Sequence, residues 1–131
     1  MEEGDIYVSP AVYLKNFAAE VFMHFGIIEA DAWQAADVLS RSDLTGIDSH
    51  GVARLHTYFD VLELGRINAK PKIKIVRKKT SVATVDGDNG LGLVVGPKAD
   101  EIAMKMAERH GSGWVSVGNT NHLGIVGGRR E

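Results

Sequence analysis

The sequence contains no cysteine, which excludes disulfides, thiolate catalysis and zinc sites that use sulfur. It also lacks a strong excess of one charge: the net charge is −2, so no basic field attracts nucleic acid or an anionic membrane. No apolar run approaches the roughly 18 residues that a membrane span needs. The acidic start Met1-Glu2-Glu3 differs from the basic start of a secretory signal. We therefore expect a cytoplasmic protein with no nucleic-acid or membrane partner.

Periodic apolar residues predict helices in the first half of the chain. Ser9-Pro10 predicts a helix start with Ser9 as N-cap, and apolar residues from Leu14 to Phe25 recur at helical spacing. A second helix is expected from about Ala30 to Asp43, and a third from a cap at Asp48 or Ser49 to Gly65. The aromatic residues expected in the core of the first helix are Phe17, Phe22 and Phe25.

The pattern changes to α/β after Pro71. Short strands are predicted at 73–75, 82–85 and 114–117, with a turn at Asp86–Gly90 and a helix from Pro97 to about Arg109. The glycine-rich stretch before that helix is not a dinucleotide fingerprint, because its third glycine comes one place too late for G-x-G-x-x-G. The chain ends after three strands and one helix, so the sheet is expected to be incomplete.

The first candidate site follows Asp48. If residues 49–65 form one helix, His50, Arg54 and Tyr58 share a stripe beside the apolar face. A histidine in the first turn is favoured in its neutral form and can exchange a proton with a hydroxyl, while Arg54 can hold a carboxylate through two hydrogen bonds. The stripe suits a molecule with a hydroxyl beside a carboxylate. The alternative is that Asp48-Ser49-His50-Gly51 is only a helix cap.

The second candidate site is the loop after the last predicted strand. Asn119 and Asn121 are expected to orient the imidazole of His122, and Gly124 allows close approach of the backbone to a ligand. A plain turn with an exposed histidine is the alternative. The other histidines, His24, His56 and His110, are expected at the surface.

Three ordered motifs together resemble the type-2 malate/L-lactate dehydrogenase family, which includes sulfolactate, ureidoglycolate and 2,3-diketogulonate dehydrogenases and Δ1-piperideine-2-carboxylate reductase. The motifs are Asp43-Leu44-x-Gly46-x-Asp48-Ser49-His50-Gly51-Val52-x-Arg54 with Tyr58 and Gly65, then Asp86-Gly87-Asp88-x-Gly90-Leu91-Gly92, then Asn119-x-Asn121-His122-x-Gly124-x-x-Gly127. The resemblance extends over essentially the whole chain.

The resemblance implies an α/β (α+β) fold. Residues 1–70 form a helical segment that carries the substrate site, and residues 71–131 begin a non-Rossmann, largely antiparallel nucleotide-binding sheet domain. It also implies a homodimer. The chain covers only the first part of the family's length, so we expect an N-terminal portion of the enzyme. A catalytically inactive fragment or a dimerisation module is the rival interpretation.

The implied reaction is hydride transfer between NAD or NADP and a small 2-hydroxy acid, with no metal. Ser49 and His50 match the family's Ser-His pair, in which the histidine is the proton donor or acceptor. Arg54 matches the arginine that holds the substrate carboxylate, and Tyr58 is expected beside it as a second substrate-binding residue. The segment expected against the nicotinamide consists of His122, Leu123, Gly124, Ile125 and Val126. In some members the histidine matching His122 is the acid/base, so both histidines remain candidates.

A hydrolase or lyase is a further alternative. Ser49 beside His50 is the only candidate for an activated hydrolytic nucleophile. It is disfavoured because side chains adjacent in sequence seldom point at each other.

Overall fold

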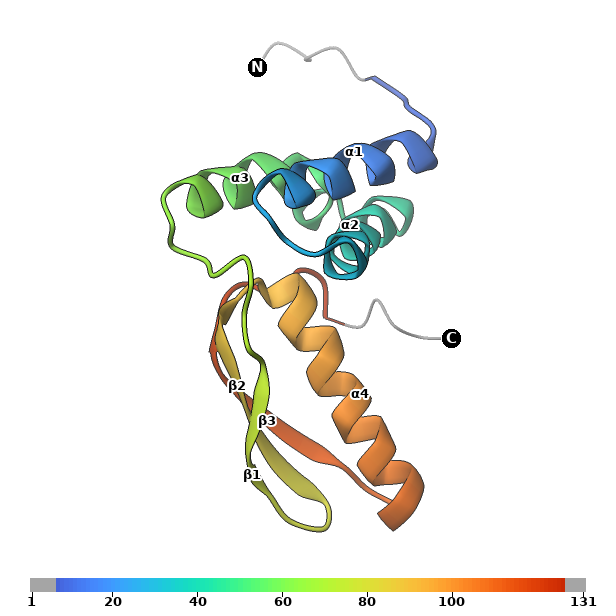
Figure 1. Cartoon of the computed structure of the whole chain (residues 1–131). Helices are drawn as coiled ribbons and strands as arrows, with labels where there is room; N and C mark the ends of the chain where they lie inside the picture. Colours follow the sequence, from blue (N-terminus) through green and yellow to red (C-terminus); the bar gives the residue numbers. More distant parts are fainter. Residues whose placement is uncertain (1–6, 127–131) are drawn as a thin grey trace.

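The computed structural model describes residues 7–126, which form a helical part and an α/β part (Figure 1). The helices of the first part are α1 (Ala11–His24), α2 (Glu29–Leu44) and α3 (Leu55–Glu63). The second part contains strands β1 (Lys74–Lys78), β2 (Val82–Gly90) and β3 (Trp114–Thr120), with helix α4 (Gly92–His110) packed against the sheet. The predicted mixed α/β class is confirmed. None of the helices within residues 7–126 is long and apolar enough to cross a membrane.

One hydrophobic core joins the two parts. Phe22 of α1 and Leu39 of α2 are fully buried, and Leu93 and Val94 from the first turn of α4 belong to the same cluster. Because the start of α4 lies under the three helices, burial of its apolar residues fixes the α/β part against the helical part.

Helix α1 departs from the prediction at its start and on one face. Pro10 occupies the cap position with extended backbone (φ −56°, ψ 132°), and no side chain caps the helix. Ser9 therefore lies one residue too early to act as the predicted N-cap. Phe17 is 57% exposed, so its prediction as a core residue is wrong. The buried face of α1 instead runs through Ala18, Ala19 and Phe22.

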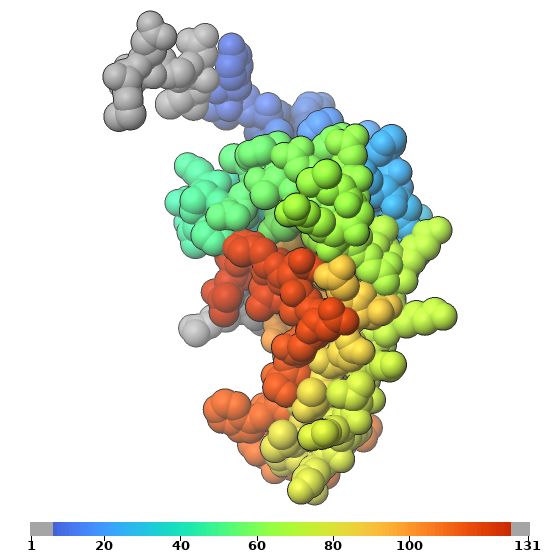
Figure 2. Space-filling view, turned by 90° about the vertical axis from the view of Figure 1, so that its left-hand side faces the viewer, coloured from blue at the N-terminus to red at the C-terminus, as the bar shows by residue number. Residues whose placement is uncertain are grey.

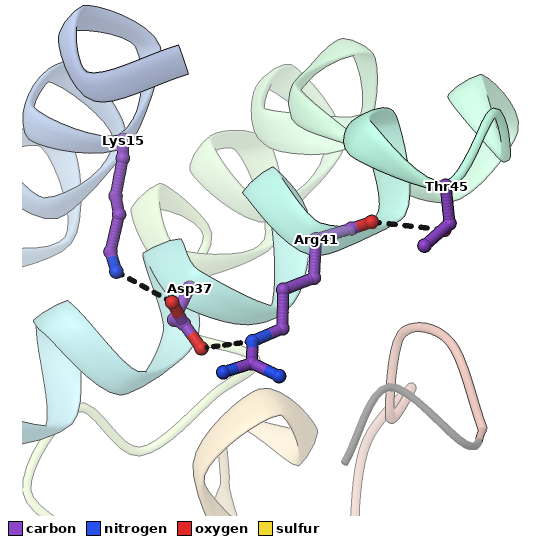
Figure 3. Close-up of polar contacts among 4 residues, drawn as sticks. All are labelled: Lys15, Asp37, Arg41 and Thr45. Atoms are coloured by element: carbon purple, nitrogen blue, oxygen red, sulfur yellow. Dashed lines mark hydrogen bonds and ion pairs between the residues drawn. The ribbon is translucent and has the colours of Figure 1, made fainter. Parts of the chain in front are cut away.

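A charged cluster connects α1 to α2 (Figure 3). The Lys15 ammonium and the Arg41 Nε both donate to the Asp37 carboxylate, and Thr45 Oγ1 donates to the Arg41 carbonyl at 2.9 Å. Burial raises the pKa of Asp37, but the Lys15 hydrogen bond and the charges of Lys15 and Arg41 outweigh it and hold that pKa below its ordinary value.

Asp37→Asn should lower the free energy of unfolding at neutral pH by less than about 1 kcal/mol, because all three charged partners are partly exposed. The folded-state pKa of Asp37 is depressed, so this stabilisation is present above the unfolded-state pKa and is lost as pH falls through the folded-state pKa. Urea unfolding should therefore separate the two proteins at neutral pH and not in acid. A difference that persists in acid would contradict the assignment.

The segment between α2 and α3 is not the continuous helix predicted from the Asp48-Ser49 cap to Gly65. Two 3₁₀ turns, Asp48–His50 and Val52–Arg54, precede α3, and Gly51 between them has extended backbone (φ −89°, ψ −154°). The cause is a tertiary contact: the Asp43 carboxylate at the end of α2 accepts the Val52 N–H at 2.9 Å. A Cβ on Gly51 would overlap that carboxylate.

The sheet has the order β1-β2-β3, with β1 antiparallel to β2 and β2 parallel to β3. This part of the sheet is therefore mixed, whereas the resemblance implied a largely antiparallel one. The predicted turn at Asp86–Gly90 is instead the end of β2. There Asp88 and Asn89 adopt positive φ (49° and 54°), and the register with β3 shifts between Asp86 and Gly90. The turn-forming residues thus make an irregularity within a strand.

Helix α4 begins at Gly92, five residues before the predicted start at Pro97. Pro97 lies inside the helix, where it cannot donate to the carbonyl four residues earlier. The apolar residues Leu93, Val94 and Val95 are buried in the first turn, and their burial outweighs the loss of that hydrogen bond.

Candidate active site

Residues of both predicted sites meet at the junction of the helical and α/β parts. In Figure 2 the segment around residue 120, in red, lies directly against the segment around residues 45–65, in green. Tyr58 of α3 is hydrogen-bonded to His122 in the loop after β3, a contact that spans 64 residues of sequence. The fold thus brings the two motifs together.

His122 is held through one ring nitrogen. Its Nδ1 lies 2.9 Å from the Tyr58 hydroxyl and 3.2 Å from the Gly124 backbone nitrogen. The ring centroids of His50 and His122 lie 5.4 Å apart, and the two ring planes are inclined by 31°. Two imidazoles from separate segments therefore lie side by side.

The Tyr58 side chain is fixed by the core. It is 4% exposed, and its ring contacts Phe22 edge-on at 6.2 Å. Burial raises the pKa of Tyr58 to about 12, although the nearby Arg54 charge opposes the shift. The hydroxyl therefore stays protonated at neutral pH. The predicted stripe of His50, Arg54 and Tyr58 on one helix does not form, because α3 begins only at Leu55.

Two basic side chains, Arg54 and His50, lie near His122. Partial desolvation lowers the pKa of His122, and the charges of Arg54 and His50 lower it further. Its ring therefore remains neutral at physiological pH, while the residue is largely exposed to solvent.

Arg54 is a half-buried cation with its stem fixed. Its Nε donates to the Ser49 carbonyl at 2.7 Å. Within residues 7–126 no carboxylate forms an ion pair with Arg54. Since Nε is occupied by the backbone, the terminal N–H groups remain to bind an anion.

Ser49 and His50 do point at each other, with Ser49 Oγ 3.0 Å from His50 Nδ1. The expectation that these adjacent side chains would not meet is therefore wrong: the 3₁₀ turn brings them together. A Ser-His hydrolase also needs a group that orients the histidine. In the described part of the chain no carboxylate is hydrogen-bonded to the His50 ring.

Asn119 and Asn121 do not orient His122, contrary to the prediction. Asn119 donates to the Asp86 carboxylate at 3.2 Å, and Asn121 donates to the Asn89 side chain at 3.2 Å and to the Gly90 carbonyl at 3.1 Å. Both amides fasten the end of β3 to the irregular end of β2. They set where the His122 loop begins.

Gly92, the last residue of the second motif, has a positioning role that the motif alone does not predict. A Cβ at this residue would overlap the backbone carbonyls of Asn121 and His122. The first residue of α4 therefore touches the His122 loop directly. The sequence feature that could have indicated this role is a glycine immediately before the apolar run Leu93-Val94-Val95, which is buried in the structure.

The rest of the His122 loop presents apolar side chains outward. Leu123 is 42% exposed and Val126 is 92% exposed, whereas Gly124 is buried with φ of 76°. Ile125 is half-buried. Gly127, the last glycine of the third motif, lies outside the described residues.

An apolar groove lies apart from these residues. A groove of about 370 Å³ runs between α1 and α3, and its lining is mostly apolar: Phe17, Val21, Val52, Ala53, Leu55, His56 and Phe59. The lining includes none of Ser49, His50, Arg54, Tyr58 and His122. Among residues 7–126 no three His, Asp or Glu side chains are placed to hold a metal ion.

Comparison with known proteins gives one consistent result. The profile described as malate/L-lactate dehydrogenase matches residues 10–130. The L-sulfolactate dehydrogenase of Methanocaldococcus jannaschii is 48% identical over 113 residues, which cover 86% of this chain and 33% of that enzyme. The malate dehydrogenase of Pyrococcus abyssi is 47% identical over 118 residues, which cover 90% of this chain and 33% of that enzyme.

The likeness extends to the fold. The solved structure of sulfolactate dehydrogenase from Methanocaldococcus jannaschii matches with a TM-score of 0.91 at 45% identity, over 92% of this chain and 35% of that one. Malate dehydrogenase from Pyrococcus horikoshii OT3 matches with a TM-score of 0.88 at 41% identity, over 94% of this chain and 37% of that one. The chain therefore spans about a third of the length of these relatives.

Proposed function

Because the chain belongs to the malate/L-lactate dehydrogenase family, we propose that it carries the substrate side of an enzyme that oxidises a small 2-hydroxy acid with NAD or NADP. The observation that carries the proposal is a half-buried arginine with no ion-pair partner in the described chain, beside two imidazoles 5.4 Å apart. In such a site the arginine can bind a carboxylate while one of the imidazoles accepts the proton of a neighbouring hydroxyl. Malate and sulfolactate, named for the relatives, are the first substrates to test.

In this mechanism Arg54 binds the substrate carboxylate through its terminal N–H groups, since its Nε is held by the Ser49 carbonyl. This contact orients C2 of the acid toward the imidazoles. The hydroxyl on C2 loses its proton to one of them, either His50 or His122. General base help of this kind contributes about 10²–10⁴ in rate.

The residues present fit a nicotinamide ring. Leu123 and Val126 expose apolar surface next to His122, and such surface can pack against a flat ring. When bound, nicotinamide supplies the acceptor for the hydride of C2. The residues His122, Leu123, Gly124, Ile125 and Val126 would hold it.

We further propose that residues 1–70 contribute the substrate side and that residues 71–131 begin the nucleotide-binding side. We also propose that the enzyme is a cytoplasmic homodimer.

The proposal is tested by isotope transfer. The chain is incubated with C2-deuterated malate or sulfolactate and NAD or NADP, and the nicotinamide is analysed by mass spectrometry. Deuterium on the nicotinamide in the wild type, and its loss in Arg54→Ala, is the expected result. No transfer to either cofactor would favour the rival interpretation, a fragment without activity.

Arg54→Lys should weaken binding of the 2-hydroxy acid by about 10-fold or more, although the charge is kept, because lysine cannot form two parallel hydrogen bonds. Calorimetry with malate measures the change. Arg66→Lys is the matched control, since Arg66 lies on the exposed turn after α3 and outside the site. Equal binding by Arg54→Lys and wild type would remove Arg54 from carboxylate recognition.

A further inference from the structure

The two histidines of the site differ in how their ring nitrogens are held. His122 receives both of its hydrogen bonds at Nδ1, one of them from the Gly124 backbone N–H. A backbone N–H can only donate. Nδ1 of His122 must therefore be the unprotonated nitrogen, and the neutral ring carries its proton on Nε2.

The Tyr58 contact then has a defined direction. Since Nδ1 has a lone pair and no proton, the Tyr58 hydroxyl donates to it at 2.9 Å. Tyr58 remains able to donate because burial keeps its hydroxyl protonated. Two donors, one from α3 and one from the loop backbone, thus converge on a single nitrogen.

Protonating Nδ1 would break the Gly124 hydrogen bond and leave the two N–H groups facing each other, and the Tyr58 hydroxyl would have to turn from donor to acceptor. The other charged or titratable groups near the ring, His50 and Arg54, also disfavour a cation there. In the described part of the chain no carboxylate is hydrogen-bonded to His122 to offset this. The surroundings therefore select one neutral tautomer.

His50 is held differently. Its Nδ1 partner is the Ser49 hydroxyl, which can either donate or accept by rotation. His50 can therefore gain or lose a proton at Nε2 and keep its hydrogen bond. This freedom is what a proton-transferring histidine requires.

We propose that Tyr58 is a positioning residue that, with the Gly124 N–H, holds His122 in its Nε2–H tautomer, so that His122 donates a hydrogen bond to the substrate and His50 transfers the proton. The second half rests on the proposed function. During oxidation the C2–H bond would break with its hydride going to the nicotinamide of the proposed function, and the hydroxyl O–H bond would break with its proton going to His50 Nε2. The C2 oxygen, on becoming a carbonyl, would accept a hydrogen bond from His122 Nε2–H. This assigns separate roles to two histidines that the motifs leave equivalent.

The test is ¹⁵N NMR of the ring nitrogens in the ligand-free chain, labelled at histidine. In the wild type, His122 should show an unprotonated Nδ1 and a protonated Nε2 throughout the neutral range. Tyr58→Phe keeps the buried ring and removes one donor, so the Nδ1 signal should shift and protonation of His122 should begin at higher pH. Tyr13→Phe, at a tyrosine 67% exposed, is the matched control and should leave His122 unchanged.

A protonated Nδ1 in the wild type would overturn the proposal, and so would identical His122 spectra in wild type and Tyr58→Phe. The first of these outcomes does not depend on the stability of any variant. Because no substrate or cofactor is present, the result is independent of the isotope-transfer experiment. Absence of deuterium transfer with the expected tautomer would overturn the proposed function and leave the Tyr58 assignment intact.

Discussion

Gly92→Ala should displace the His122 loop and lower the free energy of unfolding by about 1–3 kcal/mol, the usual cost of overpacking. The added Cβ would overlap the carbonyls of Asn121 and His122, which are backbone atoms and cannot rotate away. Alanine is the better helix former by about 1 kcal/mol, but that gain does not relieve the overlap. The clash therefore outweighs the gain in helix propensity.

Two measurements check this expectation for Gly92. Urea unfolding gives the stability, and the NMR signals of His122 and Gly124 report whether the loop has moved. Gly118→Ala is the control, because a Cβ there meets no atom within 4 Å. Wild-type stability together with unchanged His122 signals in Gly92→Ala would show that the loop does not depend on contact with α4.

Gly51→Ala should cost about 1–3 kcal/mol as well, through a different contact. Its Cβ would overlap the Asp43 carboxylate, which accepts the Val52 N–H and holds the turn between His50 and Arg54. Asp43→Ala alone should cost about 1.5–3 kcal/mol, since it removes a charged hydrogen-bond acceptor. In the double variant the overlap is gone, so its loss should be smaller than the sum of the two single losses.

Urea unfolding of the four proteins in this cycle measures the coupling, which we expect to be about 0.5–3 kcal/mol. Strict additivity would mean that Gly51 and Asp43 act independently, and that the turn carrying His50 and Arg54 is fixed by other contacts. Arg54 should also lose anion affinity in Gly51→Ala, because its Nε is anchored on the Ser49 carbonyl of the same turn.

Apolar periodicity predicted the helices well where local spacing decides the outcome. Phe22 and Leu39 lie on the buried faces as expected, and the resemblance to the dehydrogenase family is confirmed. The failures occur where tertiary contacts override local preference. The Asp43 carboxylate breaks the predicted third helix, and burial of Leu93 to Val95 starts α4 ahead of Pro97.

The geometry of the candidate site could not be obtained from spacing. Helical spacing predicts Tyr58 beside His50 and Arg54 on one face. In the structure the Tyr58 hydroxyl instead contacts His122, which is far away in sequence. Likewise Asn119 and Asn121 lie next to His122 in sequence and bond to β2 instead. The motifs predict which residues belong to the site. The packing of α3 against the loop after β3 determines which of these residues are in contact.

The most direct test of the central claim, that a 2-hydroxy acid binds between Arg54 and the two imidazoles, is an NMR titration of the chain with malate. Malate should shift the Arg54 Nε–H signal and the ring signals of His50 and His122 together, and Arg54→Ala should abolish all three shifts. Succinate, which lacks the hydroxyl, should shift Arg54 and leave the imidazoles nearly unchanged. Shifts that miss these residues, or that persist in Arg54→Ala, would contradict the account.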